Sequence, residues 1–206
     1  MRRLLILLCV ASGLSACGTA GQGGGSRSSA TTPAPISTAT PASGLAYSTA
    51  SADGVQPQPA PGSCHATGRA PYALPDRHCT PGALNPAVTQ ATINHTICVP
   101  GYTETIRPSE SITEPEKFAS MAAYGVDGRS PHDFEYDHLV PLDLGGAVND
   151  PRNLWPEPSA SPNPKDSVED QLHSLVCDGQ MSLARAQHIV ATEWVSYAEA
   201  HGAHQT

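Results

Sequence analysis

The sequence predicts an α+β fold, in which a few short strands are embedded in a mainly helical, disulfide-braced domain over residues 63–206. Three observations predict it. Apolar residues recur at helical spacing near the end of the chain. Two short apolar segments, separated by a glycine-bearing loop, precede those helices. An even number of cysteines remains for the domain once the N-terminal ones are set aside.

The N-terminus has the features of an export signal. Arg2 and Arg3 precede an apolar run over residues 4–10, which is too short to remain as a membrane-spanning anchor. The run leads into Leu-Ser-Ala-Cys at 14–17, which resembles the lipobox of bacterial lipoproteins. The resemblance implies a lipoprotein signal peptide over 1–16, lipidation of Cys17, and a chain that is exported and lipid-anchored in the bacterial cell envelope. An ordinary secretory signal cut near Ala16 is the alternative.

Residues 17–62 are rich in glycine, serine, threonine, alanine and proline, and they hold few large aliphatic side chains. Such a segment cannot offset the entropy of ordering by burying apolar surface. We therefore expect a lipid-attached, disordered linker. With about 45 residues it has a reach of about 35–40 Å, enough to hold a domain clear of a membrane surface.

Four cysteines belong to the domain once Cys9 and Cys17 are assigned to the export signal: Cys64, Cys79, Cys98 and Cys177. In an exported chain they predict two disulfides, for which three pairings exist. We prefer Cys64–Cys79, which closes a local loop, and Cys98–Cys177, which ties the front of the domain to a late helix. A zinc site is the alternative, and the absence of a Cys-x-x-Cys spacing disfavours it.

Helices are expected at three places. Thr113 and Glu116 have the residue types of a capping box and Gly125 supplies a stop, which together predict a helix over 114–124. Asn163 before Pro164 predicts the start of a second, amphipathic helix that ends near 178–179. A third helix begins at Ser182, and its apolar face runs to residue 197.

Strands are expected before the second of these helices. Residues 134–139 form a first strand, 142–150 a loop with two glycines, and 153–155 a second strand. Residues 87–93 fit either a short helix or a short strand. The local order is therefore strand, loop, strand, helix.

That order carries Asp137-His138 on the first strand, Asn153 at the second strand and Asn163 at the helix. It resembles the HNH, or His-Me finger, endonucleases, and most of all exported bacterial members. These carry Asp-His-hydrophobic-x-Pro-Leu-x-Leu-Gly-Gly followed by Asn-Leu-Trp-Pro-Glu. The resemblance runs through about residues 79–198 and implies a small ββα-metal motif. Asn163 stands where the family's name leads one to expect histidine, which makes the chain a His-Asn-Asn variant.

The resemblance implies hydrolysis of phosphodiester bonds with a divalent metal ion. His138 would be the general base, because imidazole titrates near neutral pH. Asp137 and the side-chain oxygen of Asn163 would bind the cation, Mg²⁺ in the first place, with Mn²⁺ or Ca²⁺ as alternatives. Asn153 would hold the loop or orient His138. For Asn163, a role as a helix cap alone remains open.

Basic residues are few. The chain has 11 Lys and Arg against 19 Asp and Glu, a net charge of −8, so diffuse attraction does not drive binding to a polyanion. For local contacts with phosphate we expect Arg107, Lys165 and, third, Arg152. A site that works through a metal and a few cations predicts low sequence specificity.

The expected function is therefore a metal-dependent endonuclease that cuts DNA, with RNA as an alternative substrate. It would be a monomer that reaches the membrane only through its lipid. A second hypothesis is a non-catalytic envelope lipoprotein that uses the His-Me finger scaffold as a binding module. A third is a cell-wall hydrolase, for which Asp143 and Glu157 are the carboxylates to consider.

Overall fold

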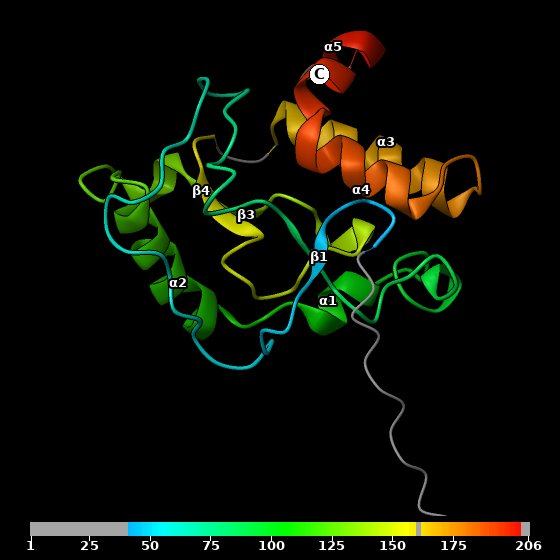
Figure 1. Ribbon diagram of the computed structural model, residues 1–206, viewed down its shortest axis with the longest axis horizontal. Coiled ribbons are helices and arrows are strands. Elements are labelled where there is room, and N and C mark those ends of the chain that lie inside the picture. Colours follow the sequence, from blue (N-terminus) through cyan, green and yellow to red (C-terminus); the bar gives the residue numbers. More distant parts are fainter. Residues whose placement is uncertain (1–40, 160–161, 203–206) are drawn as a thin grey trace, which may run out of the picture. The chain divides into compact units, whose positions relative to one another are not determined.

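The computed structural model describes residues 41–159 and 162–202 (Figure 1). The predicted signal peptide, Cys17 and the linker up to residue 40 lie outside this range. The described residues form a mixed α/β fold with five α-helices and two small sheets. Its helices are α1 Tyr102–Ile106, α2 Glu110–Ala123, α3 Pro164–Cys177, α4 Leu183–Thr192 and α5 Trp194–His201. Its strands are β1 Ala46–Tyr47, β2 Ala83–Leu84, β3 Glu135–His138 and β4 Leu154–Glu157.

The β3–β4 pair lies at the centre of the predicted strand, loop, strand, helix order. The strands are antiparallel, with Glu135 opposite Glu157 and His138 opposite Leu154. β4 is buried along its whole length and β3 is half-buried. In Figure 1, α2 lies on one side of this pair and α3 and α4 on the other. Both expected strands are present, each within one or two residues of the predicted bounds.

α3 begins where the sequence predicts. The side chain of Asn163 accepts hydrogen bonds from the amides of Lys165 and Asp166, and the side chain of Asp166 accepts one from the amide of Asn163. This reciprocal capping box satisfies amide groups that the first turn leaves unpaired. The apolar face of α3 then packs on α4 and α5 in the main core, which includes Val168, Leu172, Val176, Ile189, Val190 and Trp194.

The helix predicted from Ser182 to residue 197 is divided in two. Ser182 caps α4 as expected, but the chain leaves helical geometry at Glu193, where φ is −132°, before α5 begins. Thr192 explains the break, because its hydroxyl donates to the carbonyl of His188 at 2.7 Å and competes with the helix ladder.

The predicted start of α2 was wrong. The helix begins at Glu110, after Ser109, and Pro115 lies inside it. Glu116 does not form a capping box. It is fully buried, and its carboxylate accepts the amide of Gln56 at 2.5 Å. Glu116, which the local pattern assigned to a helix cap, therefore forms a tertiary contact instead.

Residues 41–62, assigned from composition to the disordered linker, include a segment that packs on the domain. Ala46 and Tyr47 form β1, which pairs in parallel with β2. Further along, Ser48 donates to Asp150 at 2.6 Å, and Asn149 donates to the carbonyl of Gly54. We call residues 46–58 the strap. Hydrogen bonds between polar groups hold the strap on the domain. Its low content of aliphatic residues gave no sign of them.

Both predicted disulfides are confirmed. Cys64 bonds to Cys79 across 15 residues, and Cys98 bonds to Cys177, at the end of α3, across 79 residues. Disulfides persist in oxidising compartments, so they indicate an environment outside the cytoplasm. Within the described residues, no helix is long and apolar enough to cross a membrane.

Residues 87–92 form turns and irregular structure rather than the expected helix or strand, and a short 3₁₀ helix follows at Ile93–His95.

Asn153 holds the loop between β3 and β4. It is fully buried, and its amide group donates to the carbonyls of Val140 and Ala147 at 2.9 and 3.1 Å. Its oxygen accepts the amide of Val140 at 3.0 Å. Gly146 is required at the same place, because a Cβ there would lie 1.7 Å from the carbonyl oxygen of Val140.

Replacing Asn153 with alanine is expected to destabilise the domain by about 3 kcal/mol, because three buried backbone groups lose their partner. In a domain of this size that loss corresponds to a fall in Tm of about 6–12 °C. Thermal unfolding followed by circular dichroism measures it. Asn94→Ala, at an exposed asparagine, is the control. Equal Tm values for the two variants would contradict this role of Asn153.

The two disulfides are expected to contribute unequally. By loop-closure entropy, removing Cys98–Cys177 costs about 4.5 kcal/mol and removing Cys64–Cys79 about 3 kcal/mol. The comparison uses paired Cys→Ala variants in urea unfolding. A larger loss from the Cys64–Cys79 pair would show that loop length does not govern their contribution.

Candidate functional site

His138 ends β3, and its ring orientation follows from a single hydrogen bond. Nε2 lies 3.0 Å from the carbonyl oxygen of Val148. A carbonyl only accepts, so Nε2 carries the hydrogen and Nδ1 of the neutral ring keeps a free lone pair. Burial lowers the pKa of His138 to about 4, although the Val148 carbonyl opposes the shift. The imidazole is therefore neutral at neutral pH and presents Nδ1 as a proton acceptor.

A buried ammonium group lies beside His138. The side chain of Lys165 is 1% exposed, and it donates to Asp137 at 2.7 Å, to the carbonyl of His138 at 2.9 Å and to Glu169. Burial by itself lowers the pKa of Lys165. The charges of Asp137 and Glu169, with which Lys165 forms ion pairs, outweigh that effect and raise its pKa well above the usual range. Lys165 is therefore charged, and it ties α3 to β3 at the residue that carries the imidazole.

Glu157 faces Asp137 with its proton retained. Burial and the charge of Asp137 raise the pKa of Glu157 to about 10. With its pKa raised this far, Glu157 carries its proton at neutral pH. Burial also raises the pKa of Glu169, to about 8, against the opposing charge of Lys165.

The acidic side chains near Lys165 outnumber the cation. Glu135, Asp137, Glu157 and Glu169 surround the single ammonium group. Neither carboxyl oxygen of Glu157, nor Oε2 of Glu135, accepts a hydrogen bond from any donor within 41–159 and 162–202. Carboxylate oxygens with unused lone pairs are the donors that a hard divalent cation prefers. The oxygen donors of Asp137 and Glu157 suit a hard divalent cation once Glu157 has released its proton.

The structure brings Asp137 and Asn163 to the same end of α3. Oxygen atoms predicted to bind metal, however, already accept hydrogen bonds from other groups of the chain. Lys165 holds one oxygen of Asp137. The side-chain oxygen of Asn163 accepts from two backbone amides, which use both of its lone pairs. Asn163 is thus a helix cap here, and Asp137 keeps a 13% exposed side chain.

The three predicted phosphate contacts differ in accessibility. Lys165 is buried in the acidic group, and Arg152 forms two hydrogen bonds with Asp150, at 3.0 and 2.5 Å. Arg107 is exposed, and no ion pair joins it to an acidic side chain in the described part of the chain. Its charge nevertheless acts on the pKa of both His138 and Glu135. Among the three predicted phosphate contacts, Arg107 is therefore the one that an external anion can reach.

A second group of potential ligands lies at the far end of α3. Ligand atoms of Cys98, His173 and Cys177 lie within 4.8 Å of one another, and this group could hold a metal ion. The two sulfur atoms form a disulfide in this structure. The three donors become available together only after reduction, because the thiolate is the metal-binding form of cysteine.

Sequence reasoning missed the roles of Glu135, Glu169 and Val148, and it considered Glu157 only as part of a carboxylate pair. Two signals were present. Lys165 and Glu169 are spaced i, i+4 on a predicted helix, and Glu135 and Asp137 alternate on a predicted strand, which places each pair on one face. Val148 acts through its backbone carbonyl, which residue identity does not reveal.

Comparison with known proteins adds no assignment. The chain matches no protein-family model. It also matches no curated protein and no solved structure. The site is therefore interpreted from its own geometry.

Replacing Lys165 with methionine is expected to cost about 3–5 kcal/mol near neutral pH, because buried carboxylates lose their counter-ion. Carboxyl groups left without the ammonium have raised pKa values in the folded state, so the variant gains stability relative to wild type as the pH falls. Urea unfolding at neutral and mildly acidic pH measures both effects.

Arg185→Met is the matched control. Arg185 pairs with Glu193 at the surface, where the two side chains are 53% and 41% exposed, so its loss is expected to cost no more than about 1 kcal/mol. A Lys165→Met variant as stable as this control at neutral pH would contradict the buried ion pair.

Proposed function

We propose that the chain is an endonuclease of the His-Me finger type that hydrolyses phosphodiester bonds with a divalent metal ion. One observation carries the proposal: the hydrogen bond from Nε2 of His138 to the Val148 carbonyl leaves a neutral imidazole with Nδ1 as acceptor. That is the state a general base requires at neutral pH. The order β3, loop, β4, α3 around this histidine and the Asn153 hydrogen bonds within the loop support the same assignment.

In this mechanism the residues of the chain have separate tasks. Nδ1 of His138 takes a proton from the attacking water, while Val148 keeps the ring in one orientation. Arg107 binds a non-bridging oxygen of the phosphate, to which its planar guanidinium offers two parallel donors. Lys165 holds Asp137 and the carbonyl of His138 in place and does not contact substrate, because it is buried.

A divalent ion, Mg²⁺ in the first place, would be held by Asp137 and Glu157. When bound, it supplies charge neutralisation on the phosphate and on the departing oxygen. Glu157 must release its proton to serve as a ligand, so binding of the ion is expected to strengthen as the pH rises. Asn163 is left out of this ligand set because its oxygen caps α3.

The substrate in this proposal is DNA, with RNA as the alternative, cut with low sequence specificity. Eight cations against 18 acidic residues from Ser63 onward leave few charges for contacts along a backbone. We further propose that Cys17 carries a lipid that anchors a monomeric enzyme in the cell envelope.

A binding module without catalysis is the second candidate. The observation that favours it is the ammonium of Lys165, which holds an oxygen of Asp137 where the sequence predicts a metal ligand. In that case a divalent ion would neither bind at Asp137 nor promote cleavage.

Supercoiled plasmid, incubated with the purified protein and Mg²⁺, is expected to be nicked. Nicking should stop with a chelator and fall by at least a hundredfold in His138→Ala, since general-base catalysis contributes about 10²–10⁴-fold. His188→Ala, at an exposed surface histidine, is the control and should cleave like wild type.

Arg107→Ala is expected to reduce kcat/KM about tenfold or more, because the side chain binds phosphate. It should leave Tm nearly unchanged, because no ion pair joins this exposed side chain to an acidic group in the described residues. Absence of cleavage of both plasmid and single-stranded DNA by the folded wild-type protein, or full nicking by His138→Ala, would reject the catalytic assignment.

A further inference from the structure

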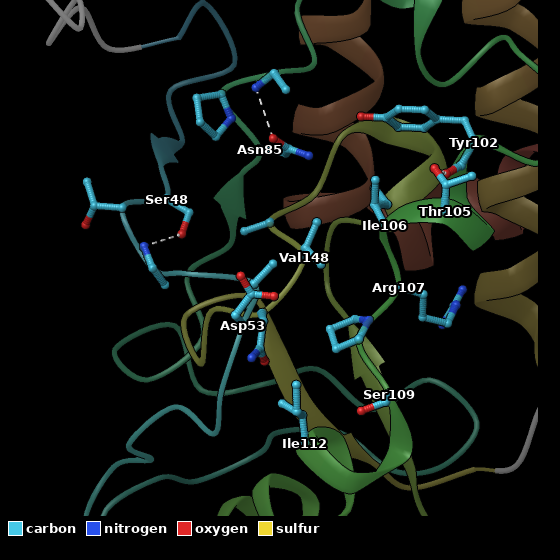
Figure 2. Close-up of a pocket in the computed structure, with 18 residues that line it drawn as sticks. Ser48, Asp53, Asn85, Tyr102, Thr105, Ile106, Arg107, Ser109, Ile112 and Val148 are labelled. Atoms are coloured by element: carbon cyan, nitrogen blue, oxygen red, sulfur yellow. Dashed lines mark hydrogen bonds between the residues drawn. The ribbon is translucent and has the colours of Figure 1, made fainter.

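A cavity opens on the other side of the residue that orients His138. Its volume is about 780 Å³, and it lies between the strap and the segment that contains α1 and the start of α2. The Val148 backbone that accepts the hydrogen bond from His138 forms part of its wall. Figure 2 shows Arg107 and Asp53 on opposite sides of Val148 in that view.

The cavity is lined by groups of opposite charge on either side of Val148. Arg107 supplies a cation on one side. Asp53, an exposed carboxylate on the strap, lies on the other side and disfavours a second phosphate there. Asn85 adds an amide group whose oxygen already accepts the amide of Ala87, which leaves its nitrogen as a donor. The cavity thus offers a site for an anion at Arg107 and a hydrogen-bond donor, the Asn85 amide, for the edge of a base.

From these observations we propose that the cavity binds one unstacked nucleoside of a single-stranded nucleic acid, while Arg107 holds the adjoining phosphate beside His138. The inference rests on the proposed function and names its substrate class. A base inside a duplex is stacked and paired, and must be extruded at a cost before it can enter such a cavity. A single strand offers its bases without that cost.

The charge of the chain supports the same choice. Duplex binding depends on many phosphate contacts made by lysine and arginine, and the chain carries a net charge of −8. Two of the cations expected to contact phosphate, Lys165 and Arg152, are instead held by carboxylates. Affinity must then come from a pocket that accepts a base, which single strands can fill.

The test measures binding with hydrolysis blocked by a chelator. Fluorescence anisotropy compares a labelled oligodeoxynucleotide of about eight nucleotides with the same strand in a duplex. We expect the single strand to bind at least tenfold more tightly. Ala87→Trp, which places a large side chain in the cavity from an exposed position, should weaken single-strand binding at least tenfold.

Two further variants make the result interpretable. Ala50→Trp fills the cavity from the strap and should have the same effect if Ala87→Trp does not fold. Ala200→Trp, an exposed position on α5, adds the same side chain elsewhere and should bind like wild type.

Equal affinity for strand and duplex, or unchanged single-strand binding in both folded cavity variants, would overturn this inference. If the protein cleaves nucleic acid but binds single strand and duplex equally well, the inference about the cavity is wrong and the proposed function remains. Selective single-strand binding by a protein that never cleaves would support the cavity and reject the catalysis.

Discussion

The ammonium group of Lys165 fixes the geometry of the site. It is removed from water, and burial of an unpaired charge is costly, so it stays charged only because carboxylates surround it. Its hydrogen bonds reach the side chain of Asp137 and the carbonyl of His138, which join the first turn of α3 to the end of β3. The position of the imidazole therefore depends on an ion pair in the interior as well as on the pairing of two short strands.

That ion pair needs a rigid frame, and two features supply it. The capping box at Asn163 sets where α3 begins and hence where Lys165 points. The hydrogen bonds of Asn153 fix the loop that carries Val148, the residue that orients His138 from its other side. The main apolar core continues along the same face of α3, through Val168, Leu172 and Val176, and holds the helix against α4 and α5. The geometry around His138 thus follows from two asparagines and one lysine placed between strands and helix.

Local signals predicted much of the fold. The strands at 134–139 and 153–155 and the cap at Asn163 could be predicted from the sequence, because each depends on nearby residue types. The even cysteine count predicted two disulfides, and of the three possible pairings the preferred one is confirmed. The start of α2 and the packing of the strap could not, since Glu116 and Ser48 form contacts with residues 60 and 102 positions away. The site shows the same limit. His138 and Asp137 could be named as candidate site residues from the sequence. The burial of Lys165 and the hydrogen bond from His138 to the Val148 carbonyl follow only from the tertiary structure.

The central claim is that His138 presents an unprotonated Nδ1 in a neutral ring, and ¹⁵N NMR of the histidine ring nitrogens tests it most directly. At neutral pH the account predicts a protonated Nε2 and an unprotonated Nδ1 for His138. His95, an exposed histidine in a 3₁₀ turn, provides an internal comparison in the same spectrum. A hydrogen on Nδ1 of His138, or a fully protonated ring at that pH, would contradict the account.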